Sequence, residues 1–181
     1  MAIPMEPSAI VAPASLAAQA RAGSAHALGD LYRLHGPALF RLAYRLTGSR
    51  DDAEDVVHDV FVGLPEALER YEERGRFEAW LRRLAARVAL MKLRAGRRQA
   101  AMWLEQNEPR QSHPERDRAV GELQAAVDAL PTPLRSVVVL KEIEGYSHSE
   151  TAELLGISVV TSRVRLMRAM SRLRRTLGGK Q

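Results

Sequence analysis

The sequence predicts an all-α protein made of two small helical domains joined by a flexible linker. Helix-forming residues such as Ala, Leu, Arg and Glu are plentiful, whereas aromatic residues make up only 5% of the 181 residues. Apolar residues recur at helical spacing in several segments, and we see no sustained alternation with the period of two that strands require. A polar segment with two prolines separates the helical segments into two groups, which predicts the linker.

The composition limits the class of protein. With 46% hydrophobic and 27% charged residues, the chain should fold as a soluble globular protein. Its net charge of +5 favours an acidic partner, with nucleic acid as the first candidate. The absence of cysteine excludes disulfides and cysteine-based zinc sites. The N-terminus lacks the pattern of a signal peptide and no apolar run could span a membrane, so we expect a cytoplasmic protein.

Residues 1–24 are rich in Ala, Pro and Ser and carry little charge. We expect a mostly disordered arm, with a short helical stretch near Leu16–Arg21 as its one candidate element. Residues 25–98 form the first predicted domain. Its first helix begins near Ala25, and Gly36-Pro37 is expected to interrupt or kink it, because proline removes a helical hydrogen bond and clashes with the preceding turn.

Two further helices complete this domain. One begins near Asp51, where several carboxylates in the first turns suit the positive end of the helix dipole. Pro65 is expected to kink or restart it. After a turn at residues 71–75, the next helix should run from Phe77 to about Arg94.

Residues 99–118 carry two prolines and mixed charges without periodicity, and they are predicted to be the linker. Residues 119–181 form the second predicted domain. Its first two helices are expected over about 119–130 and 134–144.

The end of the second domain has the pattern of a helix-turn-helix, whose second helix lies in the DNA major groove. Ser147 to Glu150 form a capping-box pattern that predicts a short helix ending at Gly156, and Ser158 can cap a last helix over about 159–177. From residue 157 to 181 there are seven basic residues and no acid. A basic, solvated helix face would explain the charge alone, but together with the helix-turn-helix spacing it favours DNA binding.

Charge is segregated in the first domain. Residues 51–73 hold nine carboxylates and one arginine, whereas residues 82–98 hold seven basic residues and no acid. Two amphipathic helices with solvated faces would show the same pattern, but the asymmetry suggests a protein partner for the acidic helix and the DNA backbone for the basic one. Tyr71, Phe77 and Trp80 could hold unstacked bases. Phe77 and Trp80 also lie on the apolar stripe, and core positions are the favoured interpretation for these two.

Nothing in the sequence indicates catalysis. The five histidines are scattered without metal-ligand spacing, and neither a phosphate-binding glycine loop nor a nucleophile elbow is present. We therefore predict a protein that is not an enzyme and that uses no metal or cofactor.

Two parts of the chain resemble a known family. The segments DDAEDVVHDVFVGLPEAL and RFEAWLRRLAARVALMKLRAGRR resemble region 2 of extracytoplasmic-function (ECF) sigma factors, and AVDALPTPLRSVVVLKEIEGYSHSETAELLGISVVTSRVRLMRAMSRLR resembles their region 4. The resemblance covers residues 27–98 and 119–177, in the family's order and with a linker of suitable length. It implies an alternative sigma factor, which binds core RNA polymerase and directs it to promoter DNA.

The resemblance also implies roles for particular residues. The first domain would dock on the coiled-coil clamp of the polymerase β′ subunit through Asp52, Glu54, Asp55, Val56, Asp59 and Phe61. It would recognise and open the −10 element through Tyr71, Phe77, Trp80, Arg83, Arg87, Arg94, Arg97 and Arg98. The helix-turn-helix would contact the β flap and read the −35 element through Ser158, Val159, Val160, Thr161, Arg163, Arg165 and Arg168. Many members are held inactive by an anti-sigma factor, often at the inner face of the membrane, and the resemblance implies such a partner here.

The chain departs from the family pattern at several positions. Arg87 stands where members usually carry Asn, Met91 stands where they carry Asp, and the usual aromatic residue near Pro65 is missing. In the recognition helix, the common Val-Gly-Thr-Val-Lys-Ser-Arg is replaced by Val-Val-Thr-Ser-Arg-Val-Arg at residues 159–165. Ser162 therefore falls on the apolar stripe, where a buried serine hydroxyl can donate to a carbonyl of the preceding turn.

Two other functions remain compatible with the sequence. An ordinary helix-turn-helix regulator would explain residues 119–181 but not the acidic-then-basic pair of helices, and it would act without polymerase. A sigma-derived antagonist or adaptor would bind polymerase without initiating transcription. The arrangement of the two domains is open as well, because a packed, inactive arrangement and an extended one both fit a linker of this length.

Overall fold

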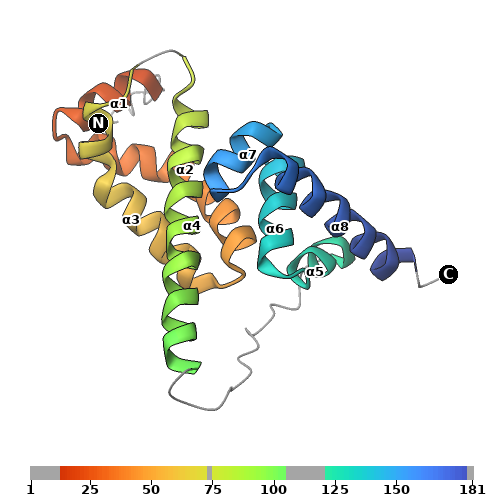
Figure 1. Ribbon diagram of the computed structural model, residues 1–181. Coiled ribbons are helices and arrows are strands. Elements are labelled where there is room, and N and C mark those ends of the chain that lie inside the picture. Colours follow the sequence, from red (N-terminus) through yellow and green to blue (C-terminus); the bar gives the residue numbers. More distant parts are fainter. Residues whose placement is uncertain (1–12, 73–74, 105–120, 179–181) are drawn as a thin grey trace, which may run out of the picture.

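The computed structural model describes residues 13–72, 75–104 and 121–178, and within these ranges all regular structure is helical, as predicted (Figure 1). The N-terminal unit comprises α1 (Pro13–Arg21), α2 (Ala25–Thr47), α3 (Arg50–Glu69) and α4 (Phe77–Leu104). The C-terminal unit comprises α5 (Glu122–Asp128), α6 (Thr132–Val138), the π-helical turn η1 (Val139–Ile143), α7 (His148–Leu155) and α8 (Val159–Gly178).

The core of the N-terminal unit lies where α2, α3 and α4 pack against one another. Each helix contributes an apolar stripe, and Leu31, Val60 and Leu81 at its centre are at most 1% exposed. Burying one such side chain contributes about 1.5–3 kcal/mol relative to leaving it exposed. Ser49 accepts a hydrogen bond from the backbone N–H of Asp52, which fixes the start of α3 directly after the end of α2.

The helical stretch expected near Leu16–Arg21 is confirmed as α1, which begins three residues earlier, at Pro13. Leu16, Ala17 and Ala20 of α1 are at most 6% exposed, because α1 packs against α2 and α3. These small apolar side chains are buried only because the two longer helices offer a surface for them, and that surface is not visible in the local sequence. Residues 1–12 lie outside the described part of the chain.

Of the two outcomes expected at each proline, the interruption of the first helix and the restart of the second do not occur, whereas the expected kinks stay predictions. α2 runs through Pro37, and α3 runs through Pro65. Leu39 in α2 and Leu64 in α3 lie close to these prolines and are fully buried. Continuous burial of one apolar stripe on each helix offsets the hydrogen bond that each proline removes.

The predicted helix over 134–144 is divided between α6 and η1. At the end of the π turn, the N–H of Glu144 donates to the carbonyl oxygen of Val139 at 2.9 Å. The π turn is followed by an ion-pair cluster with the N-terminal unit, in which the Glu144 carboxylate lies 3.5 Å from the guanidinium of Arg45 and 3.4 Å from that of Arg82. A π turn inside a helix often marks a functional position.

Two of the predicted helices have different bounds in the structure. α4 continues past Arg98 to Leu104, so the predicted linker over 99–118 begins as helix; the rest of that segment lies outside the described residues. The first helix of the second domain, expected over 119–130, is the shorter α5. The last two helices lie where the capping signals predict them, over α7 and α8.

The two units pack against each other, which settles for this structure the arrangement that the sequence leaves open. α6 and η1 contact α2, and α7 contacts α4 (Figure 1). The buried apolar residues of both units form one continuous cluster, from Leu16 in α1 to Leu173 in α8. The packed arrangement decides which surfaces of each unit are accessible.

Candidate functional site

The helix-turn-helix formed by α7 and α8 is built by local capping. Ser147 and Glu150 form the predicted capping box at the start of α7, and Gly156 ends α7 with a left-handed φ of 64°. The hydroxyl of Ser158 accepts a hydrogen bond from the backbone N–H of Thr161 at 3.0 Å, which starts α8. The starts of α7 and α8 are therefore both fixed by hydrogen bonds between residues three positions apart in the sequence.

The first turns of α8 present most of the predicted −35 residues to solvent. Val160 is 68% exposed, Ser158, Arg163 and Arg168 are exposed, and the remaining three are half-buried: Val159, Thr161 and Arg165. Further along α8, a hollow of about 740 Å³ is lined by several arginines and by the turn between α5 and α6. Its lining includes Arg165, Arg168, Arg172 and Arg175. The whole face therefore combines a protruding apolar side chain with dense positive charge, which suits a DNA groove and its phosphates.

The hydroxyl of Ser162 in α8 is paired with a side chain of the neighbouring helix. The Ser162 side chain is fully buried, and its Oγ lies 2.9 Å from Nδ1 of His148 in α7. The hydrogen bond thus joins the two helices of the motif, whereas a bond to a carbonyl of the preceding turn would stay within α8. His148 lies near the start of α7, and only the packing of α7 on α8 brings it to Ser162.

The acidic face of α3 carries the residues predicted to bind polymerase. The side chains of Asp52, Glu54 and Asp55 are 44%, 55% and 65% exposed, and Asp59 is exposed. Val56 is fully buried in the core, so a direct contact of its side chain with a partner is excluded in this structure. Val56 belongs to the apolar stripe of α3 that packs into the core, which explains why it is buried while the neighbouring carboxylates are exposed.

Lys92 of α4 lies against this acidic face. Its ammonium pairs with the carboxylates of Asp55 and, at 3.7 Å, Asp52. Partial burial acts to lower the pKa of Lys92, but the hydrogen bond and charge of Asp55, with the charges of Asp52 and Asp59, raise it above its usual value. The acidic face is therefore partly neutralised from within the chain.

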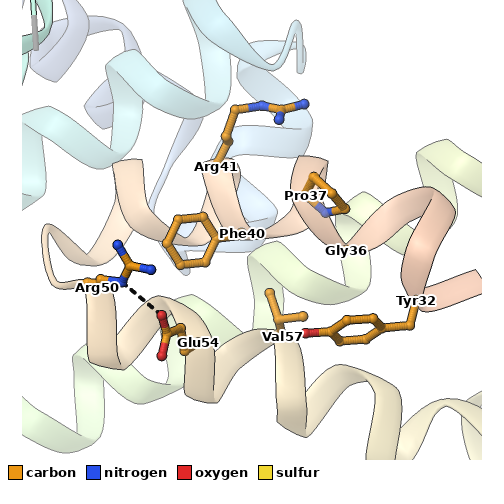
Figure 2. Close-up of a pocket in the computed structure, with 8 residues that line it drawn as sticks. All are labelled: Tyr32, Gly36, Pro37, Phe40, Arg41, Arg50, Glu54 and Val57. Atoms are coloured by element: carbon orange, nitrogen blue, oxygen red, sulfur yellow. Dashed lines mark hydrogen bonds and ion pairs between the residues drawn. The ribbon is translucent and has the colours of Figure 1, made fainter. Parts of the chain in front are cut away.

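A groove between α2 and α3 lies beside the acidic face (Figure 2). It encloses about 460 Å³, and Tyr32, Phe40 and Val57 give it an apolar lining. At its edge, Nε of Arg50 donates to the Glu54 carboxylate at 2.9 Å. Phe61, the last predicted polymerase contact, packs edge-to-face on Tyr32 with ring centroids 5.0 Å apart. The groove was not predicted from the sequence, because its shape depends on how α2 and α3 pack against each other.

The aromatic group at the start of α4 forms a compact cluster. The Tyr71 and Trp80 ring centroids are 4.6 Å apart, and those of Phe77 and Trp80 are 5.7 Å apart. Phe77 is 5% exposed, so it belongs to the core, as favoured from the sequence. Tyr71 and Trp80 are only half-buried and line a hollow of about 270 Å³ together with Arg70 and Arg76. Glu72 also lines the hollow, whose aromatic side chains and two arginines suit an unstacked base and its phosphate.

The basic face of α4 meets the C-terminal unit. Nη2 of Arg83 lies 2.7 Å from the carboxylate of Glu153 in α7, and Nη2 of Arg87 lies 3.5 Å from the same carboxylate. Arg94 donates to the carbonyl oxygen of Leu154 at 2.8 Å. The side chains of the other two predicted contacts, Arg97 and Arg98, lie outside the described part of the structure.

Comparisons with known proteins identify the family. The family model described as Sigma-70 region 2 matches residues 31–99, and the one described as Sigma-70, region 4 matches residues 121–173. The ECF RNA polymerase sigma factor SigM of Mycobacterium tuberculosis is 30% identical over 165 residues, which cover 91% of this chain and 84% of SigM. The chain belongs to the ECF family of RNA polymerase sigma factors.

This sigma factor has further relatives of similar length and one longer relative. RNA polymerase sigma factor CnrH of Cupriavidus metallidurans is 32% identical over 179 residues, covering 87% of this chain and 90% of CnrH. The ECF RNA polymerase sigma factor SigE of Mycolicibacterium smegmatis is 36% identical over 153 residues, and the match spans 59% of its length.

Solved structures agree with the family. CnrH in complex with the cytosolic domain of CnrY matches with a TM-score of 0.57 and 32% identity, over 92% of this sigma factor and 97% of CnrH. RpoE from Bartonella quintana, solved with the anti-sigma factor NepR, matches with a TM-score of 0.61 over 84% of this chain. Its identity is 21%, so this match supports the fold alone.

Region 2 of this sigma factor thus corresponds to α2–α4, and region 4 corresponds to α5–α8. Sigma factors are non-enzymatic initiation factors, so family membership confirms that the chain is not an enzyme. Among the described residues, we find no group of three or more His, Asp or Glu that could hold a metal ion. Within the described ranges, no helix is both long enough and apolar enough to cross a membrane.

Proposed function

We propose that this sigma factor binds core RNA polymerase through α3, reads the −10 element through the start of α4, and reads the −35 element through the start of α8. The observation that carries the proposal is the presence in one chain of two separate surfaces with the chemistry that suits DNA, beside an acidic face that suits a protein. One surface is the exposed recognition turn around Val160 and Arg163. The other is the hollow lined by Tyr71 and Trp80, followed by the arginines of α4.

The polymerase contact combines charge with an apolar groove. Asp52, Glu54 and Asp55 offer carboxylates to a basic partner surface, which would accelerate and orient association. The neighbouring groove between α2 and α3 offers Phe40 and Tyr32 to an apolar side chain of that partner. The β′ clamp coiled coil is the partner that the family resemblance implies for this face, and the β flap is the one implied for region 4.

Promoter opening requires capture of bases that leave the duplex. Flipping a base costs a few kcal/mol in lost stacking and pairing. Stacking on Tyr71 or Trp80 would return roughly 1–3 kcal/mol per base, and cations such as Arg76 would hold the backbone. Because both DNA readers are joined to one polymerase, binding of one raises the effective concentration of the other.

We also propose an anti-sigma factor as a regulatory partner, and a cytoplasmic location in which that partner could hold the chain at the inner face of the membrane. The support is the similar chain CnrH, whose structure was solved in complex with the cytosolic domain of CnrY. A partner of that kind would compete with polymerase for the same chain.

Reconstituted transcription tests the proposed function. Purified protein is added to bacterial core polymerase that lacks any sigma factor, with a library of genomic promoter fragments from the source organism. Initiation at discrete sites that share two spaced upstream elements would support the proposal. Polymerase binding without initiation would favour the antagonist, and DNA binding independent of polymerase would favour the simple regulator; either result would reject the sigma function.

A further inference from the structure

The face of α4 that we assign to the −10 element is covered by α7 of region 4. Arg83, Arg87 and Arg94 each have an acceptor from α7, in the carboxylate of Glu153 or the carbonyl oxygen of Leu154. These are all of the proposed −10 arginines whose side chains the structure describes. These acceptor groups of α7 therefore occupy the arginine side chains to which the phosphates of promoter DNA would have to bind.

A second, more buried contact fixes region 4 in this position. The Glu144 side chain is only 5% exposed and lies between the guanidinium groups of Arg45 in α2 and Arg82 in α4. A carboxylate removed from water needs cationic partners, because desolvation otherwise disfavours its charged form. Both partners of Glu144 belong to region 2, so its burial depends on the packed arrangement.

A third contact joins α6 to the end of α2. Nη2 of Arg135 lies 3.1 Å from the carbonyl oxygen of Leu46 and 3.0 Å from that of Thr47, at the negative end of the α2 dipole. Gly48 follows with a φ of 75°, and a Cβ atom there would lie 2.9 Å from Nη1 of Arg135. The end of α2 is thus shaped to receive this guanidinium.

We propose that region 4 closes the −10 surface of region 2 through these contacts, so that the free chain is autoinhibited for −10 recognition. This inference rests on the proposed function, since it takes α4 as the −10 reader. The carboxylate of Glu153 and a DNA phosphate compete for Arg83 and Arg87, so closure and −10 binding exclude each other. The recognition turn of α8 stays exposed, so the closed chain retains its −35 reader.

Closure has a quantitative consequence. If only an open fraction of the chain can bind at α4, the apparent dissociation constant equals the intrinsic one divided by that fraction. Weakening the contacts from the region 4 side should raise the open fraction while leaving every proposed DNA-binding residue in place. Glu144 and Glu153 are suitable targets, because neither is assigned to DNA.

The test compares the full chain with its Glu144→Gln, Glu153→Gln double variant. Both carry Trp103→Phe, which leaves Trp80 as the only tryptophan, so quenching of its fluorescence by a short oligothymidylate reports binding at the α4 surface. We expect the double variant to bind about fivefold more tightly. The matched control is Glu142→Gln, whose carboxylate is 47% exposed and pairs only locally, with Lys141 at 4.0 Å; its affinity should equal that of the parent.

A distance measurement separates opening from a simple loss of negative charge near the DNA. The chain has no cysteine, so a dye pair can be placed at Val62→Cys in α3 and Ser171→Cys in α8, both exposed positions. Energy transfer should fall in the double variant without DNA, and also in the parent at high salt, which screens the ion pairs. Tighter binding with unchanged energy transfer would overturn closure, and so would no change in either measurement.

The outcomes for closure and for the sigma function are distinguishable. If the parent chain initiates transcription with core polymerase but the variant shows neither opening nor tighter binding, closure is wrong and the proposed function stands. If energy transfer reports opening but neither protein binds core polymerase, the proposed function is wrong, and with it the interpretation of closure as control of −10 recognition.

Discussion

The imidazole Nδ1 of His148 and the hydroxyl Oγ of Ser162 lie 2.9 Å apart and join the two helices of the helix-turn-helix. Ser162 is fully buried at a position where the helix stripe would otherwise carry an apolar side chain. A buried hydroxyl without a partner costs free energy, so His148 makes a serine acceptable at this position. The pair therefore sets how α8 sits against α7.

Removing one member of this pair should destabilise the motif. Ser162→Ala leaves His148 without its partner, and we expect a loss of about 1 kcal/mol in the free energy of unfolding, measured by urea denaturation. Ser171→Ala changes an exposed serine of the same helix and should have no measurable effect. Equal stabilities of the two variants would show that the hydrogen bond contributes nothing.

The recognition turn gives a second prediction. Arg163→Ala and Arg165→Ala should each reduce −35-dependent transcription by about tenfold, because each removes a cation at the start of α8. Arg174→Ala removes an exposed cation near the end of the same helix and should have a much smaller effect. Unchanged transcription in both test variants would exclude this turn as the −35 reader.

The acidic face of α3 gives a third prediction. Reversal of charge at Asp52 and Asp55 to Lys should reduce the affinity for core polymerase by at least about tenfold, because like charges would then face the basic partner surface. The variant also loses the pairs with Lys92, so its helicity must be measured by circular dichroism. Glu66→Lys, at an exposed position of α3, is the control. Normal co-purification of the folded double variant with polymerase would contradict the assignment.

The buried His35 gives a prediction about pH. The pKa of His35 lies below its usual value, mainly because burial disfavours the charged imidazolium. The charge of Glu78 raises this pKa by a smaller amount, and the charge of Arg82 lowers it. The unfolded chain therefore takes up a proton near pH 6.5 while the folded chain does not. His35 therefore stabilises the folded chain at pH values above the pKa that His35 has in the unfolded chain. This contribution is lost as the pH falls from that value towards the lower pKa of His35 in the folded chain.

Thermal unfolding at pH 7.5 and at pH 5.5 measures this effect. The fall in melting temperature between these pH values should be smaller in His35→Phe than in the parent, because phenylalanine cannot be protonated. His58→Gln removes an exposed histidine of α3 and should leave the pH dependence unchanged. An identical pH dependence in His35→Phe and the parent would show that His35 does not control acid stability.

The sequence by itself determined the features that depend on neighbouring residues. The helices follow from apolar spacing, and the starts of α7 and α8 follow from Ser147 and Ser158, whose hydrogen bonds reach only three residues along the chain. The same local patterns located the acidic helix, the basic helix and the recognition turn. The family resemblance then ordered these parts as regions 2 and 4.

Only the tertiary structure decided which faces of those helices are accessible. Val56 lies in the core although it stands among exposed carboxylates. One face of α1 is buried although its own sequence carries a weak signal, and the groove beside Phe40 requires two helices. The guanidinium of Arg135 reaches Thr47, 88 residues away in the sequence. Such contacts depend on the geometry with which whole helices pack, and the spacing of residues within one helix carries no information about a partner that distant.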